Sequence, residues 1–196
     1  MAGSPRVGVL ALQGDVREHR RVLTALGAEV VSVRRPDELA SVDGLVLPGG
    51  ESSVIDKLIR AFGMQQPLRD AVAAGLPVYG TCAGMILLAD RIVNPIAGQQ
   101  SIGGLDVDVE RNAFGGQVES FETALDVVGF DAPVQAAFIR APLATRVGPR
   151  AHAIATLPGG GVVAVRQQAL LATAFHPEVA GETRFHELFL DLVRAA

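Results

Sequence analysis

The stretch "PVYGTCAGMILLAD", Pro77 to Asp90, contains the only cysteine of this 196-residue chain. An apolar run leads into Gly80-Thr81-Cys82-Ala83-Gly84, and a second apolar run follows it directly. A buried strand that passes through a glycine-flanked turn into a helix is typical of an α/β fold. The turn is then expected at the carboxyl end of a parallel sheet, with its central side chain at the amino end of the helix.

Apolar runs and glycine stops predict more such elements on both sides of this turn. The first half alternates strands and helices, which predicts a mostly parallel sheet covered on both faces. Strands are expected at 7–12, 30–33, 45–47 and 76–79, and helices at 16–26, 54–62, 67–74 and 83–89, the second of them capped by Ser52 or Ser53. The second half favours partly antiparallel strands at 105–110, around 118, 125, 138 and 154, at 162–166 and at 170–175, then a helix at 182–194.

Composition and charge narrow the class of protein. A chain of this length suits a single domain over residues 1–196, or at most two small ones. Hydrophobic residues make up 49% and charged residues 19%, so the chain is globular. The net charge of −4 and a single lysine, Lys57, argue against nucleic-acid and membrane-surface binding. The apolar run at 7–12 is too short for a signal segment or a membrane span, and one cysteine fits the reducing cytoplasm.

Cys82 has the setting of a nucleophile. The glycines at 80 and 84 give the form G-x-C-x-G, the thiol version of a nucleophile elbow, in which flanking side chains would clash with the neighbouring strand and helix. A helix amino end favours the thiolate and lowers a cysteine pKa that starts near about 8.5. The alternative is a small buried core residue. A core cysteine has no need of both glycines, so the nucleophile is favoured.

A cysteine nucleophile needs a base, and His176 is the best of the four histidines. It ends an apolar run and precedes Pro177, which disfavours helix, so the residue is expected to be extended. Glu178, two residues on, then faces the same side and can orient the ring. The alternative is an ordinary turn at the end of a strand. His19 and His186 fall among charged residues on predicted helices, where solvated side chains are expected, and His152 stands alone.

Catalysis of this kind also needs donors for an oxyanion. One candidate is the backbone N–H of Ala83, next to the thiol. The second is the loop Pro48-Gly49-Gly50-Glu51-Ser52, which follows a strand and precedes a helix. A Gly-Gly turn could equally be a phosphate-binding nest. It lacks the lysine of a Walker loop, which argues against nucleotide binding.

Together these stretches resemble the class I (triad) glutamine amidotransferases, and more narrowly the glutaminase subunit of pyridoxal 5′-phosphate synthase, the PdxT/SNO family. The narrower resemblance rests on "LALQGDVREH", "ERNAFGGQVESFE" and "FIRAP", which begin at Leu10, Glu110 and Phe138. It covers nearly the whole chain. It implies a three-layer α/β/α sandwich with a mostly parallel central sheet, flavodoxin-like in outline.

The resemblance also implies an activity: hydrolysis of L-glutamine to L-glutamate and ammonia, in the reaction classes hydrolase and lyase, with no cofactor and no metal. Cys82 would attack the side-chain amide, His176 would transfer protons, and Glu178 would orient His176. The implied substrate-binding and oxyanion residues are Gly49, Gly50, Glu51, Ser52, Ala83, Arg111, Ile139 and Arg140. The alternative for both arginines is simple surface solvation.

The family pairs with a (β/α)8-barrel synthase subunit in a large hetero-oligomer, which uses the ammonia to make pyridoxal 5′-phosphate. The segment with Gln13 and His19 is the implied interface, with Gln13 near the oxyanion loop. Gly116 stands where the family pattern has an arginine, and Val93 to Gly104 matches no motif. Two alternatives remain open: the glutaminase of imidazole glycerol phosphate synthase, and a thiol sensor without a working triad.

Overall fold

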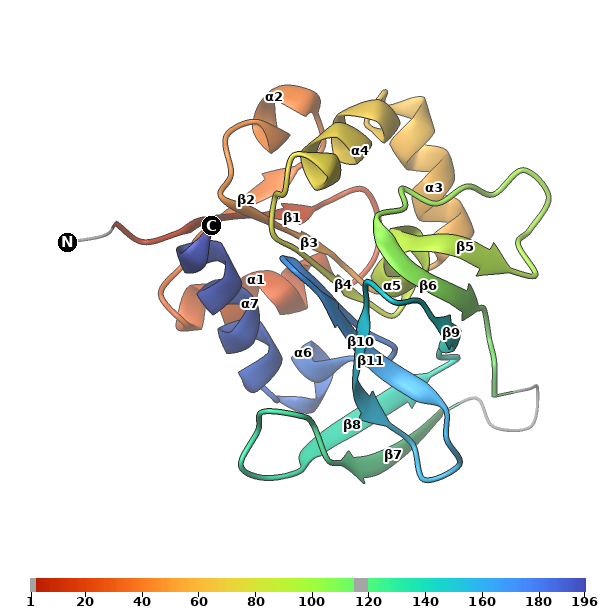
Figure 1. The fold of residues 1–196 in the computed structure, drawn as a ribbon. Coiled ribbons are helices and arrows are strands. Elements are labelled where there is room, and N and C mark those ends of the chain that lie inside the picture. The colour runs from red at the N-terminus through yellow and green to blue at the C-terminus, as the bar shows by residue number, and fades with distance from the viewer. Residues whose placement is uncertain (1–2, 115–119) are drawn as a thin grey trace.

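The computed structural model describes residues 3–114 and 120–196. In that part of the chain most strands form one curled sheet, drawn in Figure 1. Its order is β2 (Glu29–Val33), β1 (Arg6–Leu10), β3 (Gly44–Leu47), β4 (Val78–Thr81), β12 (Leu170–Thr173), β11 (Val162–Gln167), β9 (Leu143–Val147), β6 (Leu105–Glu110), β5 (Ala89–Val93), with β10 (His152–Thr156) beside β11. A separate hairpin pairs β7 (Ser120–Leu125) with β8 (Val134–Ile139).

The sheet changes character at β12. From β2 through β4 to β12 the neighbouring strands are parallel, and β5 is parallel to β6. The pairs β12–β11, β11–β10, β11–β9 and β9–β6 are antiparallel. Both expectations, a parallel first half and a partly antiparallel second half, are therefore confirmed.

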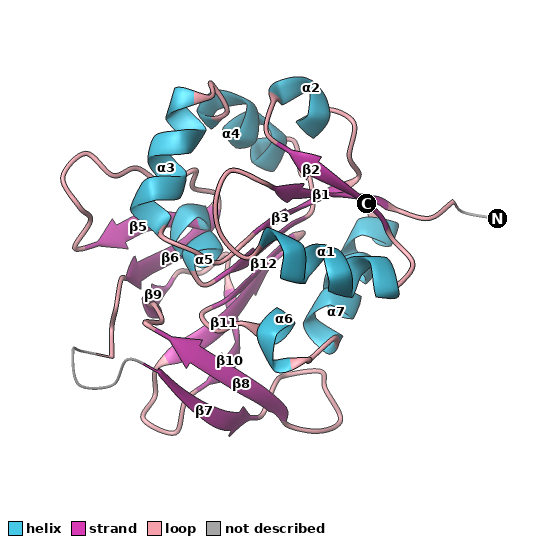
Figure 2. Ribbon diagram, turned by 180° about the vertical axis from the view of Figure 1, so that it is seen from behind, coloured by secondary structure: helices cyan, strands magenta, loops and turns pink. Residues whose placement is uncertain are grey.

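Helices cover both faces of the parallel part. Figure 2 shows α1 (Val16–Ala25), α6 (Pro177–Ala180) and α7 (Arg184–Ala195) on one face, and α2 (Pro36–Leu39), α3 (Ser52–Ala61), α4 (Gln65–Ala73) and α5 (Ala83–Leu88) on the other. Because both faces are covered, the central strands β3, β4 and β12 are buried along their whole length. The three-layer α/β/α arrangement is thus confirmed.

The apolar spacing of the helices explains this packing. In α7 Phe185, Phe189 and Val193 recur every four residues and are buried, while the charged residues between them face outward. A Cβ atom on Gly44 of β3 would meet Val193 and Phe189, so the glycine allows α7 to lie close to the sheet. No helix among the described residues is long and apolar enough to cross a membrane.

The structure corrects several local predictions. Neither Ser52 nor Ser53 caps α3; the Glu51 carboxylate does, by accepting from the backbone N–H of Ser53. The elements α2, β5, β9 and α6 were not expected. Strand β5 ends at Val93, the first residue of the segment from Val93 to Gly104. Residue 118, around which a strand was expected, and Gly116 lie outside the described residues, and β7 begins after them at Ser120.

Candidate active site

Cys82 lies at the sharp turn between β4 and α5, as expected. Its φ of 48° is in the left-handed region that residues other than glycine rarely adopt. Its backbone N–H donates to the Thr173 carbonyl on β12, at 2.8 Å, which fixes the turn to the sheet. A Cβ on Gly84 would overlap the Leu47 carbonyl oxygen, and a Cβ on Gly80 would collide with the backbone of Gly84. The glycines therefore allow the close approach that the elbow requires.

His176 leaves the carboxyl end of β12 and precedes α6, which places it at the same edge of the sheet as Cys82. Its Nδ1 lies 2.8 Å from Glu178 Oε1, and both side chains are buried. The pairing was expected, but the reasoning behind it was wrong in one respect. Pro177 starts a helical turn, so Glu178 reaches back from α6 and not along an extended strand.

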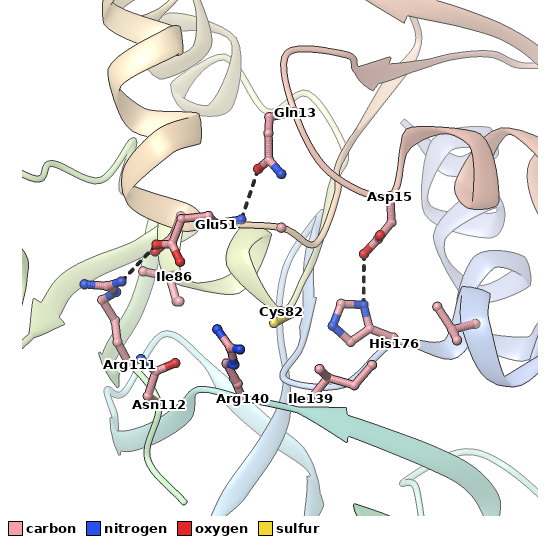
Figure 3. A pocket seen from close by; sticks show the side chains of 13 residues that line it. Gln13, Asp15, Glu51, Cys82, Ile86, Arg111, Asn112, Ile139, Arg140 and His176 are labelled. Carbon is pink, nitrogen blue, oxygen red and sulfur yellow. Dashed lines mark hydrogen bonds and ion pairs between the residues drawn. The ribbon is translucent and has the colours of Figure 1, made fainter. Parts of the chain in front are cut away.

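The thiol and the imidazole line one cavity of about 400 Å³. In Figure 3 the sulfur of Cys82 points toward the ring of His176. Burial lowers the pKa of His176, but hydrogen bonds of the ring to Asp15, Cys82 and Glu178 outweigh it and raise that pKa to about 12. Burial raises the pKa of Glu178 itself. An imidazolium beside a sulfur is the electrostatic setting of a reactive thiolate.

The Gly49-Gly50 loop forms the next wall of the cavity. A Cβ on Gly49 would overlap the His176 ring, so only glycine allows this contact. Gly50 has φ 151°, and the N–H of Glu51 donates to Gln13 Oε1 at 3.0 Å. Gln13 therefore lies beside the expected oxyanion loop. Ala83, the other expected donor, is the first residue of α5 and is buried next to Cys82.

Charged and polar side chains close the far end of the cavity. Arg111 donates to Glu51 Oε1 at 3.0 Å, which joins two of the predicted binding residues. Ile139 is 45% exposed at the end of β8, and Arg140 follows it with φ 45°. Of the predicted residues, Gln13, Gly50, Glu51, Ser52, Cys82, Arg111, Ile139, Arg140 and His176 line the cavity. Glu178 lies behind His176 and not in the wall.

Four wall residues were not predicted, and one of them contacts the histidine. Asp15 Oδ2 lies 3.3 Å from His176 Nδ1, the atom that Glu178 also contacts. Its position just after the end of β1, at the edge shared by Cys82 and His176, was the signal that could have found it. The others are Ile86, Asn112 and Val179.

The expectation for His19 and His186 was wrong. Both side chains are fully buried rather than solvated, because they share the apolar faces of α1 and α7. The ring of His19 is 2.9 Å from Thr81 Oγ1 and 2.9 Å from His186 Nε2. It is therefore not available to a protein partner on the surface of this structure.

Within the described residues, one group has the spacing of metal ligands: Asp15, His176 and Glu178, whose ligand atoms lie within 4.8 Å of one another. The Nδ1 atom of His176 is the shared member of this group, and the two carboxylates already surround it. The three side chains are accounted for by their contacts with one another, and we assign no metal to them.

Comparison with known proteins agrees with this geometry. A family described as the SNO glutamine amidotransferase family matches residues 9–195. A "Pyridoxal 5′-phosphate synthase subunit PdxT" from Leifsonia xyli subsp. xyli (strain CTCB07) is 68% identical over 191 residues, 97% of this chain and 96% of the relative. A protein with the same description from Streptomyces griseus subsp. griseus (strain JCM 4626 / CBS 651.72 / NBRC 13350 / KCC S-0626 / ISP 5235) is 58% identical over 196 residues, 100% of this chain and 99% of the relative.

A solved structure described as "Crystal structure of glutamine amidotransferase" superposes with a TM-score of 0.90 at 46% identity, covering 96% of this chain and 98% of that one. The expected class I glutamine amidotransferase fold is therefore confirmed. The expected reaction class of lyase is wrong, because the matching family is one of amidotransferases, which act by hydrolysing glutamine. The match over nearly the whole length shows that the chain belongs to the SNO glutamine amidotransferase family.

Proposed function

We propose that this protein hydrolyses L-glutamine to L-glutamate and ammonia, and that it supplies the ammonia to a partner subunit for pyridoxal 5′-phosphate (vitamin B6) synthesis. The observation that carries the proposal is the meeting of Cys82 and His176 in one cavity, in a chain of an amidotransferase family. The two residues are far apart in sequence and are brought together by the parallel pairing of β4 with β12.

The chemistry begins with the Cys82 sulfur, which attacks the side-chain amide carbon of glutamine as a thiolate. The imidazolium of His176 gives its proton to the departing nitrogen, the C–N bond breaks, and ammonia leaves behind a thioester. His176, now neutral, takes a proton from a water molecule, whose oxygen attacks the thioester carbon. The C–S bond then breaks and the sulfur leaves as a thiolate beside His176, which keeps the water proton as an imidazolium. The new carboxylic acid loses its remaining proton to ammonia or water, and glutamate is released.

Glu178 holds the His176 ring in place for both proton transfers. Its Oε1 accepts from Nδ1–H, which leaves Nε2 for the thiol and for the leaving group. Because the carboxylate is fully buried, bulk solvent has no access to this contact. The protonated state of His176 is stabilised by the hydrogen bonds of its ring to Asp15, Cys82 and Glu178.

Substrate binding is assigned to the opposite end of the cavity. The guanidinium groups of Arg111 and Arg140 fit the α-carboxylate of glutamine, which binds best to planar paired donors. The oxyanion that forms on the amide oxygen would receive backbone N–H groups from Ala83 and from the Gly49-Gly50 loop. Glu51 and Ser52 complete this loop, and Ile139 supplies an apolar wall.

The relatives are described as subunits of pyridoxal 5′-phosphate synthase, and we extend that role to this chain. Its partner would then be a (β/α)8-barrel synthase subunit in a large hetero-oligomer, docked near the Gln13 segment. We further propose that residues 1–196 act as one glutamine amidotransferase domain. A free cysteine nucleophile fits a cytoplasmic site of action, since that compartment is reducing.

A coupled ammonia assay with and without the synthase subunit tests this function. Ammonia release from glutamine, stimulated by the synthase and absent in Cys82→Ala, is the expected result. Labelling of Cys82 by a glutamine-like diazoketone should be blocked by glutamine. Labelling of Cys82 that glutamine does not reduce, together with no ammonia release in the presence of the synthase, would indicate a thiol sensor instead.

A further inference from the structure

Two buried histidines lie behind the catalytic pair and take no part in the mechanism above. His19 comes from α1 and His186 from α7, and their Nδ1 and Nε2 atoms, respectively, lie 2.9 Å apart. Neither has any exposed surface. Burial lowers the pKa of His19 well below its usual value, helped by repulsion from His186 and His176 in their protonated forms, and burial lowers the pKa of His186 to about 4. Both rings are therefore neutral at neutral pH.

The neutral pair has two possible proton arrangements. In the first, His19 Nε2–H donates toward Thr81 Oγ1, at 2.9 Å, and His19 Nδ1 accepts from His186 Nε2–H. In the second, every direction is reversed and His186 Nδ1 carries the proton. His186 Nδ1 has no partner among the described residues. The second arrangement would thus bury an N–H without an acceptor, which proteins avoid more strictly than an unused lone pair.

The neighbouring carboxylate favours the same arrangement. Glu178 Oε1 lies 3.5 Å from His19 Nε2 and 2.8 Å from His176 Nδ1. An N–H at His19 Nε2 attracts the carboxylate, whereas a lone pair there would repel it. The other oxygen, Oε2, has no hydrogen-bond partner among the described residues. Glu178 Oε1 therefore accepts a hydrogen bond from His176 Nδ1–H and is attracted by charge to the more distant His19 Nε2–H.

The geometry points to His19 as a positioning residue for glutamine hydrolysis: its Nε2–H, donated to Thr81 Oγ1, attracts the Glu178 oxygen 3.5 Å away by charge and so favours the position of that carboxylate beside His176, and His186 holds His19 in the tautomer that allows this. The inference rests on the proposed function only for its kinetic consequence. The approach of His19 to Glu178 joins α1 to α6, and so links the amino-terminal helix to the residue that contacts His176. His19 acts through Glu178 and does not touch the substrate.

The other groups that face the histidine pair support this assignment. Tyr79 of β4 packs against both rings, edge-on, with centroid distances of 6.4 Å to His19 and 5.4 Å to His186. Its hydroxyl is 3.2 Å from Thr173 Oγ1, so it is engaged elsewhere. Within residues 3–114 and 120–196, Glu182 is the anion that opposes the lowering of the His186 pKa. Among the described residues outside the histidine pair, Thr81 is thus the only one that hydrogen-bonds directly to the pair.

The experiment compares two substitutions of His19 that differ in reach. The amide nitrogen of Gln occupies roughly the place of a histidine Nε2, whereas that of Asn does not reach it. His19→Asn is expected to lower kcat for glutamine, measured with the synthase subunit present, by about 10-fold or more, with KM changed much less. His19→Gln is expected to restore most of kcat. His152→Asn, at an exposed histidine of β10, is the matched control for loss of an imidazole.

A second measurement reports on the position of the ring without any turnover. Imidazole ¹H–¹⁵N spectra of the free subunit should show the Nδ1–H signal of His176 shifted in His19→Asn and close to wild type in His19→Gln. An unchanged His176 signal and unchanged kcat in a folded His19→Asn protein would overturn the proposal. If the wild-type protein released no ammonia, the proposed function would fail, and the spectra would still decide the role of His19.

Folding of the variants is checked by thermal unfolding. If His19→Asn does not fold, His186→Leu replaces it, because it removes the N–H that fixes the His19 tautomer. The His176 signal is then expected to shift in the same direction. An unchanged His176 spectrum in His186→Leu would count against the proposal in the same way.

Discussion

Acidification should destabilise this protein through His186, and the size of the effect follows from its burial. The pKa of His186 is lowered from 6.5 to about 4 in the folded chain, and in the unfolded chain it returns to its ordinary value. Between these two values the unfolded state binds the extra proton and the folded state does not. The stabilising contribution of His186 is therefore fully present above its pKa in the unfolded chain, and it is lost as the pH falls toward its pKa in the folded chain.

The free energy of unfolding should fall by about 2 kcal/mol between pH 8 and pH 5 from this one group. That loss is large beside a typical total of about 5–15 kcal/mol. The assay is urea unfolding at both pH values for wild type and His186→Gln, which keeps an amide donor toward His19 but cannot titrate. A slope of about 2 kcal/mol per molar urea turns the loss into a midpoint shift of about 1 M.

The comparison between the two proteins isolates His186, because the other titrating groups are present in both. Wild type should lose about 2 kcal/mol more than His186→Gln on acidification. His152→Gln, at an exposed position, should lose as much as wild type. An equal acid loss in wild type and His186→Gln would refute the argument, since it would mean that His186 is protonated as easily in the folded state as in the unfolded state.

Three further outcomes are expected. Gly84→Ala should destabilise the fold by about 2 kcal/mol or more in urea unfolding, because its Cβ would overlap the Leu47 carbonyl oxygen. Asp15→Asn should lower the pKa of His176, since it removes a carboxylate that raises it, and an NMR titration of the imidazole would measure this. Arg111→Ala should raise KM for glutamine about 10- to 100-fold with a smaller effect on kcat, as a charged hydrogen bond contributes about 1.5–3 kcal/mol; an unchanged KM would remove Arg111 from the substrate site.

The elbow, the His-Pro-Glu segment and the first strands and helices could be predicted because their signals are local. Glycines at fixed offsets from Cys82 and a proline after His176 restrict the backbone within a few residues. The burial of His19 was missed because its immediate neighbours, Glu18 and Arg20, are charged. The helical spacing of His19 with Val22 and Leu23 carried the correct signal, since residues three and four apart share a face.

Contacts between distant segments could not be predicted in the same way. The position of Asp15 after β1 indicates the edge of the sheet at which it lies, but its contact with His176 also depends on how the loop after β1 packs against the end of β12, which no local pattern encodes. The short strands β5 and β9 owe their conformation to pairing with β6, and β9 reaches β6 across the intervening strands β7 and β8. Their sequences carry weak preferences that tertiary contacts override.

The active site draws on the beginning, the middle and the end of the polypeptide: the loop after β1, the turn before α5 and the segment after β12. During synthesis Cys82 is made well before His176. On the proposed function, glutamine hydrolysis therefore cannot start until β12 has been made and has paired with β4. Proteolytic removal of β12 and the segment after it would therefore abolish glutamine hydrolysis while leaving Cys82 in place.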